Sequence, residues 1–259
     1  MKCSMDFYWQ TLAVAQAEIH KLLRDPSELL SRAVQPVLWL AVFGQVFSQV
    51  RGIPTGTLDY LDFMAPGILG QSILFSGIFY GIAIIWERDL GIVHKLLVTP
   101  ASRAALVLGK ALAAGARGLV QAIVVYGVAA SLHVGIRWEP GAVISVALGV
   151  FLGSCIFATF SLVIACIVMT RERFMGIGQI LTMPLFFASN AIYPLELMPD
   201  WLKAIAVANP LTYLIDALRA SMVLGGHGQH TAATNFGVMA AVLLLLLAAA
   251  TALYPRLGR

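Results

Sequence analysis

Few residues in this chain of 259 amino acids have the types and spacing that enzymatic chemistry requires. A phosphate-binding loop for ATP needs the pattern G-x-x-x-x-G-K-[ST]. The Gly-Lys pair at Gly109 and Lys110 is followed by Ala111, and Ala104 occupies the position of the first glycine. The zinc pattern H-E-x-x-H and the serine pattern G-x-S-x-G are absent from the sequence, and its five histidines are scattered: His20, His94, His133, His227 and His230. We therefore expect no catalysis, bound metal or cofactor in this chain.

A charged segment between two apolar runs, residues 87–103, has instead the pattern of a docking helix. Apolar side chains recur in it at helical spacing and a proline follows them: Leu90, Val93, Leu96, Leu97 and Pro100. Polar side chains fill the positions between: Arg88, Asp89, His94 and Lys95. A short, rigid helix with two faces suits a groove on a partner protein. Because no energy source is visible in the chain itself, we predict that a partner acts on it at this segment.

The elements that must position this segment are membrane helices. Hydrophobic residues make up 59% of the chain and charged residues 12%, with a mean hydropathy of +0.85; soluble domains carry about 25% charged residues. Six apolar stretches approach the roughly 20 residues that cross a bilayer. They are residues 33–50, 63–85, 106–134, 142–170, 176–193 and 236–253. We predict an all-α polytopic membrane protein with about six spans, forming one domain over residues 1–259.

The basic residues predict which side of the membrane each span end occupies. One set of ends carries most of them: Lys2, Lys21, Arg24, Arg32, Arg88, Lys95, Arg103, Lys110, Arg171, Arg173, Arg256 and Arg259. The other set carries Arg51, Arg137, Lys203 and Arg219. Cytoplasmic loops retain Lys and Arg, so both termini are predicted to be cytoplasmic. The net charge of +4 follows from this topology, and without a basic face interleaved with aromatic platforms we expect no nucleic-acid partner.

The first 25 residues predict an amphipathic helix on the inner membrane surface. Over residues 7–24 the apolar side chains share one face: Tyr8, Leu12, Ala15, Ile19, Leu22 and Leu23. Gln10, Lys21 and Arg24 fall on the opposite face. Asp25 as a cap and Pro26 as a first helical residue then begin a new helix. Both an active interface helix and a passive surface anchor fit this pattern.

Residues 193–226 are too interrupted to span the bilayer and too apolar for a free loop. Pro199 and Asp200 predict the start of one short helix, and Asn209 as cap with Pro210 as first residue predict another, ending at the glycines of residues 225–226. We expect both helices on or in the outer leaflet. Asp216 and Arg219, three apart, are placed to pair on one helix face.

Small and charged residues within the spans indicate how the helices pack. Gly77 and Gly81 in the second span, and Gly149 and Gly153 in the fourth, have the spacing that lets helices approach closely. Cys3, Cys155 and Cys166 have no metal or disulfide spacing and are interpreted as structural. Arg117 lies close enough to the cytoplasmic side for its guanidinium to reach the membrane surface.

Transport powered by a partner has two rivals. Ion-driven carriers place acids within their spans. The acids here lie at span ends or in loops, which counts against such a carrier, although Asp62 and Glu87 at the ends of the second span keep it open. A membrane scaffold without transport activity is the third hypothesis.

Two motifs make the chain resemble a membrane subunit of the type 2 family of ATP-binding-cassette exporters, which includes daunorubicin-type drug permeases and O-antigen and other glycan exporters. The first comprises Glu87, Arg88, Gly91, the run LLVTP, Arg103 and Leu108 to Lys110. The second comprises Asn209, Pro210, Leu211, Thr212, Tyr213, Asp216, Ala217, Leu218 and Arg219. The resemblance covers essentially the whole chain.

The resemblance implies a permease pair that docks two separate ATPase subunits in a bacterial cytoplasmic membrane, with ATP and Mg on the ATPases. The coupling helix would then involve Glu87, Arg88, Leu90, Gly91, Val93, His94, Lys95, Leu96, Leu97 and Pro100. The interface helix beside it would use Leu12, Ile19, Lys21 and Arg24, and residues 193–226 would form outer re-entrant helices. Residues expected to face a path along the first, second and fifth spans are Phe75, Phe79, Tyr80, Phe186, Phe187 and Tyr193. The cargo would be an amphipathic drug, a lipid or a lipid-linked glycan.

Overall fold

The computed structural model describes residues 2–24, 34–44, 46, 58–168 and 170–258, and these are almost entirely helical. The long helices are α1 (Lys2–Arg24), α4 (Tyr60–Asp89), α6 (Arg103–Ser131), α7 (Pro140–Val168), α8 (Arg171–Phe187) and α11 (Ala232–Leu253). The short ones are η1 (Trp39–Gly44), α5 (Ile92–Leu97), η2 (Leu195–Leu197), α9 (Asp200–Ala208), α10 (Pro210–Met222) and η3 (Tyr254–Gly258). The prediction of an all-α polytopic membrane protein is confirmed.

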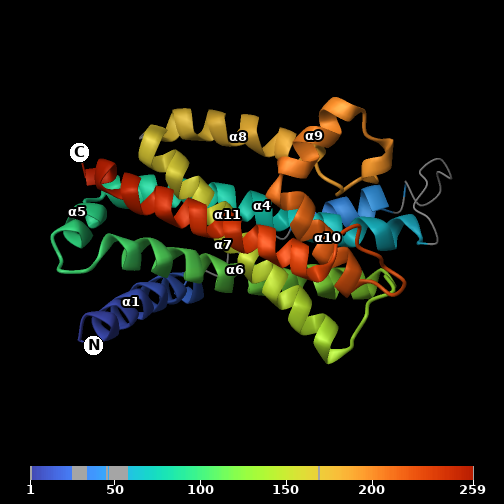
Figure 1. Ribbon diagram of the computed structural model, residues 1–259, viewed down its shortest axis with the longest axis horizontal. Helices are drawn as coiled ribbons and strands as arrows, with labels where there is room; N and C mark the ends of the chain where they lie inside the picture. Colours follow the sequence, from blue (N-terminus) through green and yellow to red (C-terminus); the bar gives the residue numbers. More distant parts are fainter. Residues whose placement is uncertain (1, 25–33, 45, 47–57, 169, 259) are drawn as a thin grey trace.

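Four helices of the described chain are long and apolar enough to cross a membrane. They are α4, α6, α7 and a continuous segment formed by α11 and its extension to Leu257, and they correspond to the predicted second, third, fourth and sixth spans. In Figure 1 they run side by side along the long axis. The centre of the bundle is formed by α4 and α7, which are mostly buried, whereas α11 exposes most of its apolar surface.

The two remaining predicted spans differ from these four. The described part of the first is an apolar helix over Val34–Gly44; the rest of residues 33–50 lies outside the described residues. The fifth is α8, which begins at Arg171 and ends at Phe187, both earlier than predicted. Its end is fixed by Asn209, whose side-chain amide donates hydrogen bonds to the carbonyls of Leu185 (2.6 Å) and Ala188 (2.9 Å).

The glycines of α4 and α7 pack helices of the same chain against one another. Gly77 lies against Phe157 of α7, with no room for a Cβ atom. Gly81 lies against Ser161 of α7 and Phe174 of α8, and its amide donates a 2.9 Å hydrogen bond to the Ser161 hydroxyl. Gly153 is covered by Leu214 of α10. The predicted close approach of these helices is therefore an intrachain contact.

At the end of the bundle opposite α5, the two short helices have different environments. Asn209 caps α10 as predicted, since its side-chain oxygen accepts from the Leu211 amide at 3.0 Å. Every residue of α10 from Leu211 to Arg219 is buried, against α4, α7 and α11. By contrast α9 is largely exposed. Within the bundle, the side chains of α10 thus fill the core, whereas α9 lies at the periphery; that both helices lie on or in the outer leaflet stays a prediction.

The same region contains a correction to the predicted pairing of Asp216 with Arg219. Both side chains are buried, but no ion pair joins these two described residues. Asp216 instead accepts hydrogen bonds from the Gln229 and His230 amides and from the Asn235 side chain. The Arg219 guanidinium lies over the Phe63 ring at 3.9 Å and donates to the Asn190 carbonyl at 2.6 Å. Tertiary partners replace the local pair.

Helix α1 packs against α6, and both chain ends lie at the end of the bundle that carries α5 (Figure 1). The face of α1 that is buried contains Thr11, Ala15, Glu18 and Leu22. Tyr8 and Leu12, on the predicted apolar face, are exposed. The apolar face is thus turned partly outward, and the protein contact includes a buried acid.

Candidate functional site

The sequence-predicted docking segment, residues 87–103, forms a loop at one end of the bundle and is called the α5 loop below. It leaves α4 through a tight turn in which the Leu90 amide donates to the Trp86 carbonyl and the Gly91 amide to the Arg88 carbonyl. Gly91 has φ +72°, a left-handed conformation that favours glycine. This turn lets a new helix, α5, begin immediately at a different angle.

The two faces of α5 differ from the predicted ones. Val93 is fully buried, and Leu96 and Leu97 pack with it against the cluster that contains Tyr254 and Leu257 of η3. Leu90, predicted on the same face, is 68% exposed because the Gly91 turn separates it from the helix. The outward surface of the α5 loop is therefore formed by Leu90, His94, Lys95, Val98 and Pro100.

The α5 loop is also fastened where it enters α6. Helix α5 ends at Leu97, before Pro100, and the Thr99 hydroxyl donates to the Leu96 carbonyl at 2.6 Å. The Ser102 side chain caps α6 by accepting from the Ala105 amide. The Ser102 amide in turn donates to the Gln10 side chain of α1 at 3.0 Å. Both the loop and α6 are therefore tied to α1.

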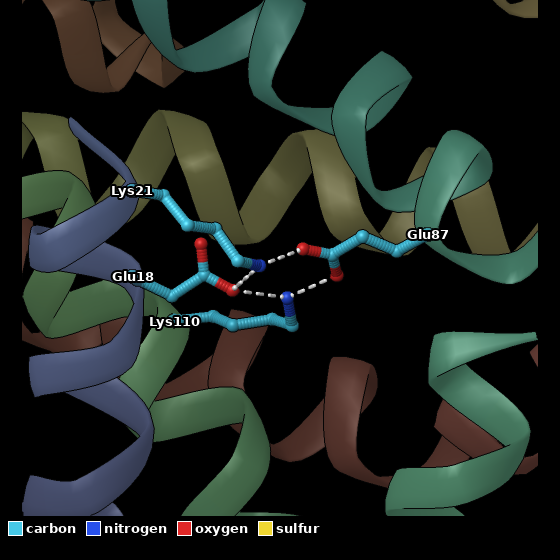
Figure 2. Close-up of polar contacts among 4 residues, drawn as sticks. All are labelled: Glu18, Lys21, Glu87 and Lys110. Atoms are coloured by element: carbon cyan, nitrogen blue, oxygen red, sulfur yellow. Dashed lines mark hydrogen bonds and ion pairs between the residues drawn. The ribbon is translucent and has the colours of Figure 1, made fainter. Parts of the chain in front are cut away.

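A four-residue ion network lies beneath the α5 loop (Figure 2). It is called the Lys110 network and consists of Glu18 and Lys21 of α1, Glu87 of α4 and Lys110 of α6. The Lys110 amine lies 2.6 Å from the Glu87 carboxylate and 2.8 Å from that of Glu18. Lys21 lies 2.5 Å from Glu87 and 3.2 Å from Glu18. Three helices thus meet at one charge-balanced cluster.

The electrostatics of the Lys110 network depend on its burial. The Lys110 side chain is only 2% exposed, so an unpaired ammonium there would be very costly. Burial alone raises the pKa of Glu18, but the charges and hydrogen bonds of Lys110 and Lys21 outweigh it, so that its pKa lies below the ordinary 4.5. Glu18 is thus ionised at neutral pH, and the network is held by complementary charges.

Sequence patterns identified only half of this network as site residues. The sequence predicts Lys21 and Glu87 as site residues, whereas Lys110 appears in it only as part of the first family motif. Glu18 was missed, because it is separated from Lys110 by 92 positions in the chain. The signal in the sequence is an acid close to the apolar face of an amphipathic helix, one turn from Lys21.

A second ion cluster accounts for Arg88, which was predicted to contact a partner. Asp89 pairs with Arg88 at 2.7 Å and with Arg171, the first residue of α8, at 2.6 Å. The Arg171 guanidinium also lies 4.3 Å from the Trp86 ring centre. Arg88 therefore contributes to an internal link between α4 and α8, whereas His94 and Lys95 remain on the outward surface.

The remaining predicted site residues lie elsewhere. Ile19 and Arg24 are at least partly exposed on α1. Of the six expected path residues, Phe75 and Phe79 line a cavity beside the first apolar helix, and Tyr80 and Phe186 are buried in the core. Phe187 is exposed at the end of α8, and its carbonyl accepts a hydrogen bond from the Tyr193 hydroxyl.

Two further residues from the sequence analysis have internal partners. The Arg117 guanidinium lies 5.3 Å from the Tyr80 ring centre. Tyr213 donates to the Val207 carbonyl and thereby joins α10 to α9.

A comparison of the sequence with known protein families identifies the family of this chain. Residues 10–223 match the family model described as ABC-2 type transporter. The chain belongs to the ABC-2 type transporter family. The match begins within α1 and includes the whole α5 loop and α10.

Relatives of this ABC-2 chain include two permeases and a nodulation protein. It is 32% identical over 219 residues to the ycf38 transport permease of Cyanophora paradoxa, covering 82% of this chain and 74% of the relative. It is 27% identical over 203 residues to the daunorubicin resistance ABC transporter permease DrrB1 of Streptomyces coeruleorubidus, covering 76% and 69%. It is 25% identical over 232 residues to nodulation protein J of Bradyrhizobium diazoefficiens, covering 89% and 86%.

Family membership and the four apolar helices establish a multi-pass membrane protein that is a transmembrane subunit of an ABC exporter. In such ABC-2 permeases the membrane subunit is generally non-catalytic. Among the described residues, no group of three or more His, Cys, Asp and Glu side chains is placed to hold a metal ion.

Proposed function

We propose that this ABC-2 permease docks a separate ATPase subunit at the α5 loop and exports its cargo along a path formed with a second copy of itself. ATP and Mg bind to the ATPase. The observation that carries the proposal is the connection between an outward surface at His94 and Lys95 and the three helices joined by the Lys110 network. The loop is both accessible to a partner and mechanically linked to the bundle.

In this proposal, two sets of contacts transmit the movement of the ATPases to the membrane helices. Closure of the ATPases on ATP displaces the α5 loop, and Val93 passes that displacement to η3 at the end of α11. Glu87, at the end of α4, passes it through Lys110 to α6 and through Lys21 to α1. Charged and close-packed contacts favour discrete rearrangements over gradual deformation. The helices then shift as rigid bodies between inward- and outward-facing states.

The proposed topology places the α5 loop and both termini in the cytoplasm of a bacterial cell, at the cytoplasmic membrane. The two ends lie at the α5 end of the bundle (Figure 1). The span ends predicted to be cytoplasmic are also those that carry most of the basic residues. Retention of Lys and Arg on the cytoplasmic side supports this orientation. Membrane lipid covers the exposed apolar face of α11.

The proposed cargo is an amphipathic drug, a lipid or a lipid-linked glycan. A relative named as a daunorubicin resistance ABC transporter permease supports a drug as one such cargo.

An ion-coupled carrier is the alternative function. The two acids that could bind a driving ion, Asp62 and Glu87, already have partners within the protein. Glu87 is paired with Lys110 and Lys21. Asp62 accepts a hydrogen bond from the Gly135 amide at 3.1 Å. Ion binding by either acid would have to displace these partners.

Transport by the purified chain in vesicles distinguishes the two functions. We expect cargo movement only when the native ATPase and ATP are present, and none with an imposed proton or sodium gradient alone. Transport driven by the gradient without ATPase would overturn the proposal.

A further inference from the structure

A cavity of about 190 Å³ lies between the first apolar helix and the middle of α4. Its described lining is Gln35, Pro36, Gln71, Ser72, Phe75, Ser76 and Phe79. Amide and hydroxyl groups thus face the same space as two aromatic rings, and this described lining contains no acidic or basic side chain. Polar groups that converge on one space beside aromatic side chains are typical of a small-molecule site.

Two of the polar side chains open on this cavity. Gln71 is 4% exposed and Ser72 is 6% exposed, and both line the cavity. Neither is among the described residues whose polar atoms are fully enclosed without a partner, so the amide and the hydroxyl face the cavity space. In the apolar surroundings of a membrane helix, such groups favour a bound molecule that has its own donors and acceptors.

We propose that this cavity binds the uncharged, hydrogen-bonding part of the exported cargo. Gln71 and Ser72 supply the hydrogen bonds, while Phe75 and Phe79 form an aromatic wall suited to a flat ring. Burial of an ion here is unfavourable because the described part of the lining offers no counter-charge. The inference rests on the proposed export function and narrows the cargo to neutral amphipathic compounds, in preference to phosphate-bearing glycan lipids.

The neighbouring charge does not alter this selectivity. Ser76 also lines a much smaller cavity of about 10 Å³ that contains Arg117. The Arg117 guanidinium is held over the Tyr80 ring rather than in the larger space. The larger cavity is itself below the roughly 300–1,000 Å³ of typical ligand sites. It therefore holds one ring-sized portion of a cargo whose remainder lies along the helices.

The test is a binding titration with a matched pair of probes. The full chain is placed in lipid nanodiscs together with the ATPase that co-purifies with it, and the intrinsic fluorescence of quinizarin, a neutral dihydroxyanthraquinone, is followed. Its sulfonate has the same ring system with a negative charge. We expect quinizarin to bind and its sulfonate to bind at least about tenfold more weakly.

Substitutions then test whether quinizarin binds in this cavity. Gln71→Leu preserves size and apolar packing but removes the amide, and is expected to weaken quinizarin binding about tenfold. Gln71→Asn keeps an amide and is expected to retain much of the affinity. Ala147→Leu changes a different groove, between α6 and α7, and serves as the control. Absent quinizarin binding, equal binding of both probes, or unchanged affinity in Gln71→Leu would overturn the inference.

The two proposals fail in different ways. Failure of an ATPase to co-purify with the chain contradicts the proposed function and leaves the titration measurable on the chain itself. If the ATPase co-purifies but the cavity binds neither probe, or binds both equally, only the cargo assignment is contradicted.

Discussion

The Lys110 amine of α6 lies 2.6 Å from the Glu87 carboxylate of α4, directly below the turn that begins the α5 loop. Lys110 also pairs with Glu18 of α1, so this one amine joins the end of α4 to both α6 and α1 (Figure 2). The position of this ion pair makes it a test of how the loop and the bundle communicate.

Lys110→Met is predicted to destabilise the protein and to uncouple it. Removing one partner of a buried ion pair leaves uncompensated charge and costs about 3–5 kcal/mol. We expect a lower thermal unfolding midpoint in detergent and less cargo moved per ATP hydrolysed, while the outward α5 surface still retains the ATPase. Glu172→Gln, at an exposed position of α8, is the control. If the Lys110→Met variant moves as much cargo per ATP hydrolysed as the wild type, the Lys110 network has only a structural role.

Acidic pH is predicted to weaken the link between α1 and α6 through Glu18. The folded-state pKa of Glu18 lies below the ordinary 4.5 because its interactions with Lys110 and Lys21 exceed the burial penalty. A lowered folded-state pKa means that its stabilisation is complete above pH 4.5 and is lost as pH falls through the folded value. Thermal unfolding midpoints of wild type and Glu18→Gln should therefore differ at pH 7 and converge only as pH falls below 4.5 and through the lowered folded-state pKa of Glu18. A constant difference across this range would contradict the assignment.

Features set by neighbouring residues were predictable, whereas features set by distant partners were not. The start of α10 follows from Asn209 and Pro210, and the spans of α4, α6, α7 and α11 follow from hydropathy alone. Local spacing failed for Asp216, because the amides of Gln229 and His230 reach its carboxylate from another loop.

The orientation of α1 shows the same limit for the site. Its amphipathic pattern predicts that one apolar face decides its placement. Packing against α6 instead buries the neighbouring face with Glu18, since Lys110 supplies a charge that no local pattern reveals. Likewise, the Gly91 turn rather than helical spacing decides that Leu90 faces outward.

Charge reversal on the outward α5 surface is predicted to release the ATPase. Lys95 is exposed and forms no ion pair among the described residues, so Lys95→Glu alters the surface without breaking an internal link. We expect at least a tenfold loss of ATPase in co-purification, equivalent to about 1.4 kcal/mol, with normal membrane insertion. Lys203→Glu on exposed α9, at the other end of the bundle, is the matched control and should retain the ATPase. Full retention by both variants would place docking elsewhere.

Gly81→Ala is predicted to separate α4 from its neighbours. A Cβ atom at this position would overlap the Phe174 ring and the Ser161 hydroxyl, so the helices must move apart at a cost of about 1–3 kcal/mol. Gly127→Ala on α6 is the matched control, because nothing lies within 4 Å of a Cβ atom there. In a helix interior that substitution alone stabilises by roughly 0.5–1 kcal/mol. The two variants should therefore shift the thermal unfolding midpoint in opposite directions, and equal shifts would contradict the packing of α4 against α7 and α8.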